Sequence, residues 1–160
     1  MGHQLTEAEL DRLGIAFHEA GHAVAAVVLG GRVHRAVVDE HPHTEHDPLP
    51  GLDAGIVYAG PWAEARWTLG YQPGPADMRR ALARNGSDDR TLCAAGGPHQ
   101  GAHIVSLMER CWPAVKTLAK GLYFTGTATH TDVCAALGLT DGGGPGSLGL
   151  TLIRSGLRTA

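Results

Sequence analysis

Only three cysteines occur in the 160-residue sequence, and no two of them form a CxxC pair. The wide spacing of Cys93, Cys111 and Cys134 argues against a disulfide framework and against a zinc site built from thiolates. We therefore expect reduced, mostly buried thiols in a cytoplasmic protein.

Positive charge and long apolar runs are also scarce. The formal net charge is -3, so no basic surface predicts a nucleic-acid partner. The longest apolar run, residues 23–29, is far shorter than the roughly 20 residues that cross a bilayer. The N-terminus is polar and acidic, unlike a signal peptide. We expect one globular domain with no nucleic-acid partner and no membrane association.

One short motif carries most of the functional information. Residues 18–22 read HEAGH, a HExxH pattern, inside a segment that we predict to be a long helix. Residues four apart lie on one helix face, so His18 and His22 can hold one metal ion. Glu19 lies about 100° around the helix, where its carboxylate can reach a water on that metal. This is the starting set for zinc-assisted peptide hydrolysis, and the alternative is two histidines that are merely polar surface residues.

The helix that carries the motif has clear boundaries. Thr6 and Glu9 form a capping-box pattern, which places the helix start near Glu7. The pair Gly30 and Gly31 ends the helix. We therefore predict that the motif lies in the middle of a rigid N-terminal helix.

The remaining sequence predicts a mainly α-helical protein with a small β element. Residues 33–38 have the composition of a short strand. Helices are expected at residues 52–69, with a kink at Pro61, and then at 76–84, from 87 to about 95, at 98–124 with an interruption at Pro113, and at 132–137. The Gly-rich residues 140–160 are predicted to be a flexible tail, which leaves residues 1–139 as the domain.

A second group of possible metal ligands lies in residues 39–50. His41, His43 and His46 stand there among four acidic residues. A loop interrupted by prolines does not position ligands as a helix does, so we favour a solvated loop over a rival metal site.

A catalytic zinc site usually has a third protein ligand and an open position for water. The three-histidine continuation HExxHxxGxxH is absent, because Ala25 and Val28 occupy its next two defining positions. The third ligand is therefore expected to be a later carboxylate. Glu64 and Asp89 are the main candidates and Asp88 is the next, and spacing alone does not choose between them.

A family resemblance favours one of these candidates. The segment FHEAGHAVAAVV, residues 17–28, resembles the catalytic helix of the FtsH-type metalloproteases, peptidase family M41. GRVHRAVV resembles the strand that follows that helix, and AGPWAEARW resembles the family's "GGRAAEE" helix. GSDDRTLCAA and CWPAVKTLAKGL resemble its "GASNDLxRAT" segment and its late "NWPAIEALAEAL" helix. The order of the motifs is kept, and the resemblance covers roughly residues 10–138.

The resemblance implies a role for each site residue. His18 and His22 would bind zinc, and Glu19 would be the general base. Asp89 matches the aspartate that closes the family's "SND" and would be the third ligand. Glu64 would then be a carboxylate that orients a ligand histidine.

The resemblance also implies a zincin-like helical peptidase domain that cleaves peptides or unfolded proteins. M41 proteases carry membrane helices and an AAA ATPase module, whereas no GxxxxGK[ST] motif occurs here. We therefore expect a stand-alone domain, with a separate ATPase as a possible partner and no implied ring assembly. The strand at residues 33–38 is expected to pair with substrate at its edge, and Gly21 to leave room for a strand or substrate. The alternative function is a catalytically inactive M41-like binding or adaptor domain.

Overall fold

Helix α1 (Glu7–Val28) forms the centre of the fold. The computed structural model describes residues 4–160, with 62% of the chain in helices and 7% in strands. The predicted capping box starts α1: Glu9 N donates to Thr6 Oγ1 at 3.3 Å, and Thr6 N donates to Glu9 Oε2 at 2.8 Å. At the other end Gly30 takes a positive φ of 94°, which ends the helix as predicted.

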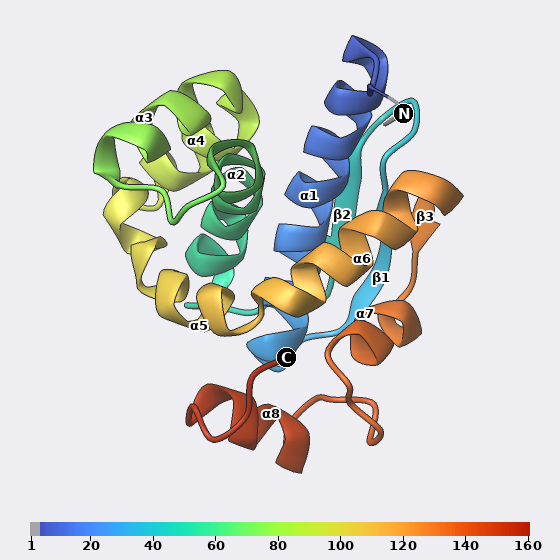
Figure 1. Cartoon of the computed structure of the whole chain (residues 1–160). Coiled ribbons are helices and arrows are strands. Elements are labelled where there is room, and N and C mark those ends of the chain that lie inside the picture. The colour runs from blue at the N-terminus through green and yellow to red at the C-terminus, as the bar shows by residue number, and fades with distance from the viewer. Residues whose placement is uncertain (1–3) are drawn as a thin grey trace.

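Helix α1 contacts α2, α5, α6, α7 and α8, whereas α3 and α4 pack against α2 (Figure 1). Helix α2 lies beside α1 and leads into α3 and α4, and α6 crosses in front of α1 in this view. Two short 3-10 turns, Pro98–Gln100 and Ala102–Ile104, precede α5. The helices are α2 (Asp53–Leu69), α3 (Pro75–Arg84), α4 (Gly86–Ala94), α5 (Val105–Arg110), α6 (Trp112–Thr125), α7 (His130–Ala136) and α8 (Leu148–Arg154).

Gly21 allows α1 and α2 to approach closely. A Cβ at this position would clash with the carbonyl oxygen of Ala59 and lie 2.7 Å from Cβ of Ala63. Gly21 therefore makes room for a neighbouring helix, and the expectation of a strand or substrate there is wrong. Helix α2 itself continues through the buried Pro61.

Three short antiparallel strands form a sheet in the order β2-β1-β3. They are β1 (Val33–Val37), β2 (His43–His46) and β3 (Thr127–Ala128). Strand β1 is central, because Ala36 and Val37 pair with both neighbouring strands. The expected substrate-binding edge on β1 is therefore wrong, since β2 is the edge strand beside α1. Strand β2 lies within the predicted loop at residues 39–50, and its polar sequence HTEH gave no strand signal.

The predicted 98–124 helix is divided into several elements. The two 3-10 turns and α5 come first, and α6 begins only at Trp112. Pro113 occupies the first turn of α6, where a missing backbone N–H costs no helical hydrogen bond. The proline therefore starts a helix here, and the prediction of one interrupted helix is corrected.

The C-terminal segment is packed against the domain, which corrects the prediction of a flexible tail from residue 140. Ser147 caps α8, and both Leu150 and Ile153 are buried. Arg154 Nε donates to the carbonyl oxygen of Val28 at 2.6 Å, which ties α8 to the end of α1. The predicted boundary between residues 139 and 140 therefore does not separate ordered from flexible chain, and residues 1–3 of the predicted domain lie outside the described residues.

The three cysteines are free thiols. Cys111 and Cys134 are buried and Cys93 is exposed, in line with the expectation of mostly buried thiols. Burial raises the pKa of Cys111 to about 12, so this thiol stays protonated. Within residues 4–160, no helix combines the length and the apolar character that a membrane span requires.

Candidate metal centre

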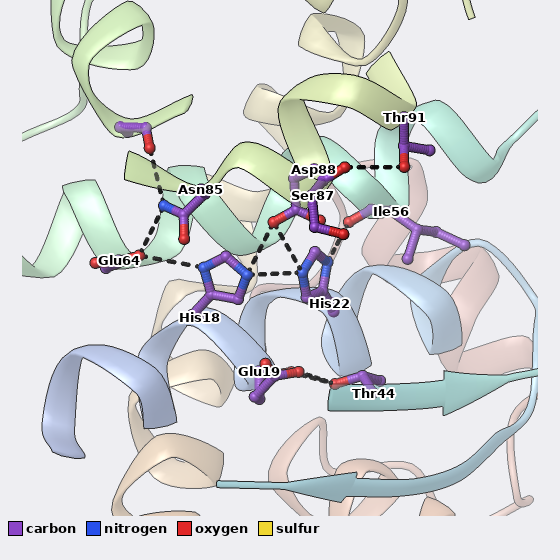
Figure 2. A network of polar contacts seen from close by, with 11 residues as sticks. His18, Glu19, His22, Thr44, Ile56, Glu64, Asn85, Ser87, Asp88 and Thr91 are labelled. Carbon is purple, nitrogen blue, oxygen red and sulfur yellow. Dashed lines mark hydrogen bonds and ion pairs between the residues drawn. The ribbon is translucent and has the colours of Figure 1, made fainter. Parts of the chain in front are cut away.

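His18 and His22 project from one face of α1 toward α2 and α4, as Figure 2 shows. Their Nε2 atoms lie 3.0 Å apart, and the two side chains are only 13% and 12% exposed. The four-residue spacing brings the rings together as predicted. Gly60 makes this possible on the α2 side, because a Cβ there would clash with the ring of His22.

The Nδ1 atom of each ring forms a hydrogen bond with another residue. Nδ1 of His22 donates to the carbonyl oxygen of Ile56 at 2.8 Å, and Nδ1 of His18 donates to Oε2 of Glu64 at 3.2 Å. Both partners are acceptor oxygens, so each Nδ1 carries the hydrogen. In a neutral imidazole the remaining nitrogen then has a lone pair. Two Nε2 lone pairs therefore face each other, an arrangement that requires a positive charge between them.

Asp88 of α4 adds a third electron-rich atom. Its Oδ2 lies 3.0 Å from Nε2 of His18 and 3.7 Å from Nε2 of His22. A tetrahedral zinc ion with N and O ligands at about 2.0–2.2 Å holds its ligand atoms roughly 3.3 Å apart. The three observed separations, 3.0, 3.0 and 3.7 Å, lie on either side of that value. In the described part of the chain, these three residues are the one group placed to hold a metal ion.

Asp88, and not the expected Asp89, is the carboxylate at the histidine pair. Helix α4 begins at Gly86, and neighbouring residues on a helix point about 100° apart, so only one of the two aspartates faces α1. Oδ1 of Asp89 instead lies 3.9 Å from Sγ of Cys93, one turn further along α4. The motif resemblance placed the aspartate one residue too late.

The three residues attract positive charge strongly. Burial lowers the pKa of His18, but hydrogen bonds to Asp88 and Glu64 and the nearby charge of Glu19 outweigh it and raise this pKa to about 9. Burial also raises the pKa of Asp88, but its hydrogen bonds with His18 and His22 outweigh that effect and keep this pKa well below its usual value. A cation is therefore favoured at the Nε2 pair, whether it is a proton or a metal.

Glu64 lies on the Nδ1 side of the His18 ring. Its Oε2 accepts hydrogen bonds from Nδ1 of His18 and from Nδ2 of Asn85, at 3.2 and 3.1 Å. Burial raises the pKa of Glu64, but the hydrogen bond with His18 outweighs it and the net effect lowers this pKa. Glu64 therefore orients His18 and does not belong to the group of three. Asn85 was missed, because the Asn-Gly pair was interpreted only as a helix stop.

Glu19 lies beside this group but turns toward the sheet. The residue is 4% exposed, and its Oε2 accepts a hydrogen bond from Oγ1 of Thr44 at 2.7 Å. Figure 2 shows this bond between α1 and β2, on a different side of α1 from the histidine pair. Glu19 is therefore free of the ligand group, as expected of a base. Thr44 was missed, because its strand was predicted to be a loop.

A cleft of about 1300 Å³ is lined by the side chains described above, namely His18, Glu19, His22, Thr44, Glu64, Asn85 and Asp88. Its walls are α1, the start of α4, the α2 helix and the edge strand β2. Glu19 and the two histidines face this common space. Apolar residues also line the cleft: Leu10, Gly14, Ile15, Ile56, Val57 and Trp67. The arrangement suits binding of an extended chain next to a cation.

The rival histidines of residues 39–50 form no ligand group of their own within the described chain. Nδ1 of His43 bonds to the carbonyl oxygen of His41 at 2.7 Å, and Nδ1 of His46 bonds to that of Asp47 at 2.8 Å. They lie on or next to β2, and His43 and His46 line the cleft.

Comparison with known proteins adds no family to this picture. No family model matches the sequence, and a search of the curated proteins also finds no match. The functional argument therefore depends on the geometry of the cleft and on the motif resemblance.

Proposed function

We propose that this protein is a zinc-dependent metallopeptidase similar to the M41 peptidases. The observation that carries the proposal is the convergence of three electron-rich atoms, Nε2 of His18, Nε2 of His22 and Oδ2 of Asp88. Both Nδ1 atoms are engaged elsewhere, so both lone pairs are available for a metal.

The donor set fits zinc. Two imidazoles and one carboxylate leave a fourth position for water, as in catalytic zinc sites. A zinc ion in such a set supplies Lewis acidity, which makes water nucleophilic near neutral pH and polarises a carbonyl oxygen. Other divalent metals suit the same nitrogen and oxygen ligands, and zinc is our proposal because HExxH motifs on helices bind it.

Glu19 is the proposed general base. It adjoins His18 in sequence, faces the cleft and is not among the three ligand residues. Its carboxylate would take a proton from the attacking water and pass it to the leaving amine. Thr44 donates to Oε2 at 2.7 Å, so it fixes the direction of the carboxylate and leaves Oε1 to handle the proton.

The proposed substrate is an extended peptide or an unfolded protein segment. Strand β2 lines the cleft, and within residues 4–160 its one partner strand is β1, so its outer edge is available for a further strand. Backbone hydrogen bonds to that edge would place a peptide across the cleft beside Glu19. A separate ATPase that delivers unfolded chains stays a prediction from the family resemblance.

The decisive experiment compares the wild-type protein with Glu19→Gln. We expect zinc-loaded wild-type protein to cleave casein. Glu19→Gln should lose at least about 100-fold in rate, the lower range for a lost general base, while it keeps one zinc per chain. Zinc content measured on the same samples separates loss of the base from loss of the metal. Full activity of Glu19→Gln would refute the assignment of the base.

The same assay tests the adaptor alternative. If the wild-type protein holds zinc tightly but cleaves neither casein nor short peptides, the domain binds chains without hydrolysing them. Binding of a fluorescent casein peptide would then be unchanged between wild type and Glu19→Gln.

A further inference from the structure

Asn85, the only asparagine in the sequence, joins two parts of the candidate metal centre. Its Nδ2 donates to Oε2 of Glu64 at 3.1 Å and to the carbonyl oxygen of Ala81 at 2.9 Å. Both partners accept hydrogen bonds, so the amide can present only its NH₂ group to them. The orientation of this side chain is therefore fixed by its partners.

The position of Asn85 makes these bonds unusual. Asn85 is the N-cap residue of α4, a position at which asparagine normally accepts a hydrogen bond from a backbone N–H of the first turn. Its side chain makes no such bond here. The side chain therefore bonds to Glu64 and to the end of α3, and it does not cap its own helix.

The consequence for His18 follows from the hydrogen bonds around its ring. Oε2 of Glu64 accepts one bond from Asn85 and one from Nδ1 of His18. On the opposite side of the ring, Nε2 contacts Asp88, which lies three residues after Asn85 in the first turn of α4. Both nitrogens of His18 are thus connected to the same short segment, one through Glu64 and one directly (Figure 2).

We infer that Asn85 is a positioning residue for the metal centre. It fixes the Glu64 carboxylate as an acceptor for Nδ1 of His18, so that Nε2 presents its lone pair to the cation. The inference depends on the proposed metal site, but it does not depend on peptide hydrolysis.

The test is a double-mutant cycle on zinc affinity, measured by competition with a chromophoric chelator. Replacement of an outer partner of a metal ligand typically costs 10–100-fold in affinity, and we expect Asn85→Ala to fall in roughly that range. In the Glu64→Ala background, Asn85→Ala should change the affinity by less than about 3-fold, because the intermediary is already absent. Thr91→Ala, on the same helix, is the matched control and should keep the wild-type affinity.

A spectrum separates positioning from folding. The visible absorption of bound Co²⁺ reports ligand geometry, and it should change in Asn85→Ala and stay unchanged in Thr91→Ala. If Asn85→Ala does not fold, Asn85→Ser replaces it, since serine is a good N-cap residue.

Two results would overturn the inference: an Asn85 variant that binds zinc within about 3-fold of wild type, or an equal loss in both backgrounds. A wild-type protein that binds no zinc would refute the metal site and the inference together. A zinc-binding protein without peptidase activity would refute only the proposed hydrolysis.

Discussion

Helices α1 and α4 both contribute to the candidate metal centre, but they are built very differently. Helix α1 has 22 residues, most of them buried in its C-terminal two thirds, and a complete capping box. Helix α4 has nine residues, of which only Leu92 is buried, and its N-cap side chain makes no capping bond. The two histidines thus belong to the most deeply buried helix, whereas their carboxylate partner comes from a weakly packed one.

This difference shows where the site gains its precision. On α1 the fold itself holds the imidazoles, because displacing them means moving the core. On α4 few apolar contacts hold Asp88, so the position of its carboxylate depends on polar contacts to α1 and α2. We therefore expect both halves to be formed without metal, and α4 to be the half that unfolds locally more often and gains more stability when the metal binds.

The largest expected effect tests the carboxylate on α4. Asp88→Ala should weaken zinc binding by more than the roughly 100-fold that the loss of an outer partner costs, because it removes a ligand. Asp89→Ala should leave the affinity within about 3-fold, because its carboxylate points along α4 toward Cys93. Chelator competition on both variants measures the two values.

The reverse outcome would restore the aspartate that the motif resemblance favoured. Zinc loss in Asp89→Ala, with Asp88→Ala unaffected, would mean that α4 is rotated by one residue in the zinc-bound protein. The paired substitutions therefore also test which face of α4 is turned toward α1.

A smaller effect is expected from two glycines of α1. Gly21→Ala should destabilise the protein by about 1–3 kcal/mol, because its Cβ would collide with the backbone of α2. Gly14→Ala is the matched control, since its Cβ would lie 3.8 Å from Cζ3 of Trp67, an ordinary contact. There alanine should be neutral or stabilise by up to about 1 kcal/mol. Urea unfolding of both variants measures the difference, and equal changes would contradict the helix packing.

The same contrast explains what the sequence could predict. The capping box at Thr6 and Glu9 and the terminal glycines set the limits of α1, and a fixed spacing put His18 and His22 on one face. All of these signals come from residues that are close together in the sequence, and the histidine spacing follows the period of the helix. They correctly predicted the limits of the helix and the placement of both imidazoles on one face.

The other half of the site lacked such signals. Two adjacent aspartates near a helix start differ in direction by about 100°, and only the packing of α4 decides which of them faces α1. Asn85 carries out its role through tertiary contacts that no local pattern encodes. The edge strand β2 is four residues long and polar, so its existence depends on pairing with β1.

The pH dependence of stability is the smallest expected effect, and it measures the coupling between the two helices. His18 belongs to α1, but Asp88 of α4 and Glu64 of α2, together with the nearby Glu19, raise its pKa from 6.5 to about 9 against the opposing effect of burial. Between these two values the folded protein binds a proton that the unfolded chain has released. The stability of the zinc-free protein should therefore fall as the pH rises, by at most about 1.4 kcal/mol per pH unit.

Urea unfolding of zinc-free protein between pH 6.5 and 7.5 tests this expectation, in a range where an ordinary thiol, with a pKa of about 8.5, is still mostly protonated. Asp88→Asn should flatten the trend, because it removes the carboxylate that holds the proton on Nε2 of His18. Saturating zinc should cancel or reverse the fall of stability with pH. The metal replaces the proton on Nε2 of His18, and zinc binds more tightly as the pH rises. If the stability of zinc-free wild type rose with pH, α4 would not be held against α1 before the metal binds, and the ion would have to bring the two helices together itself.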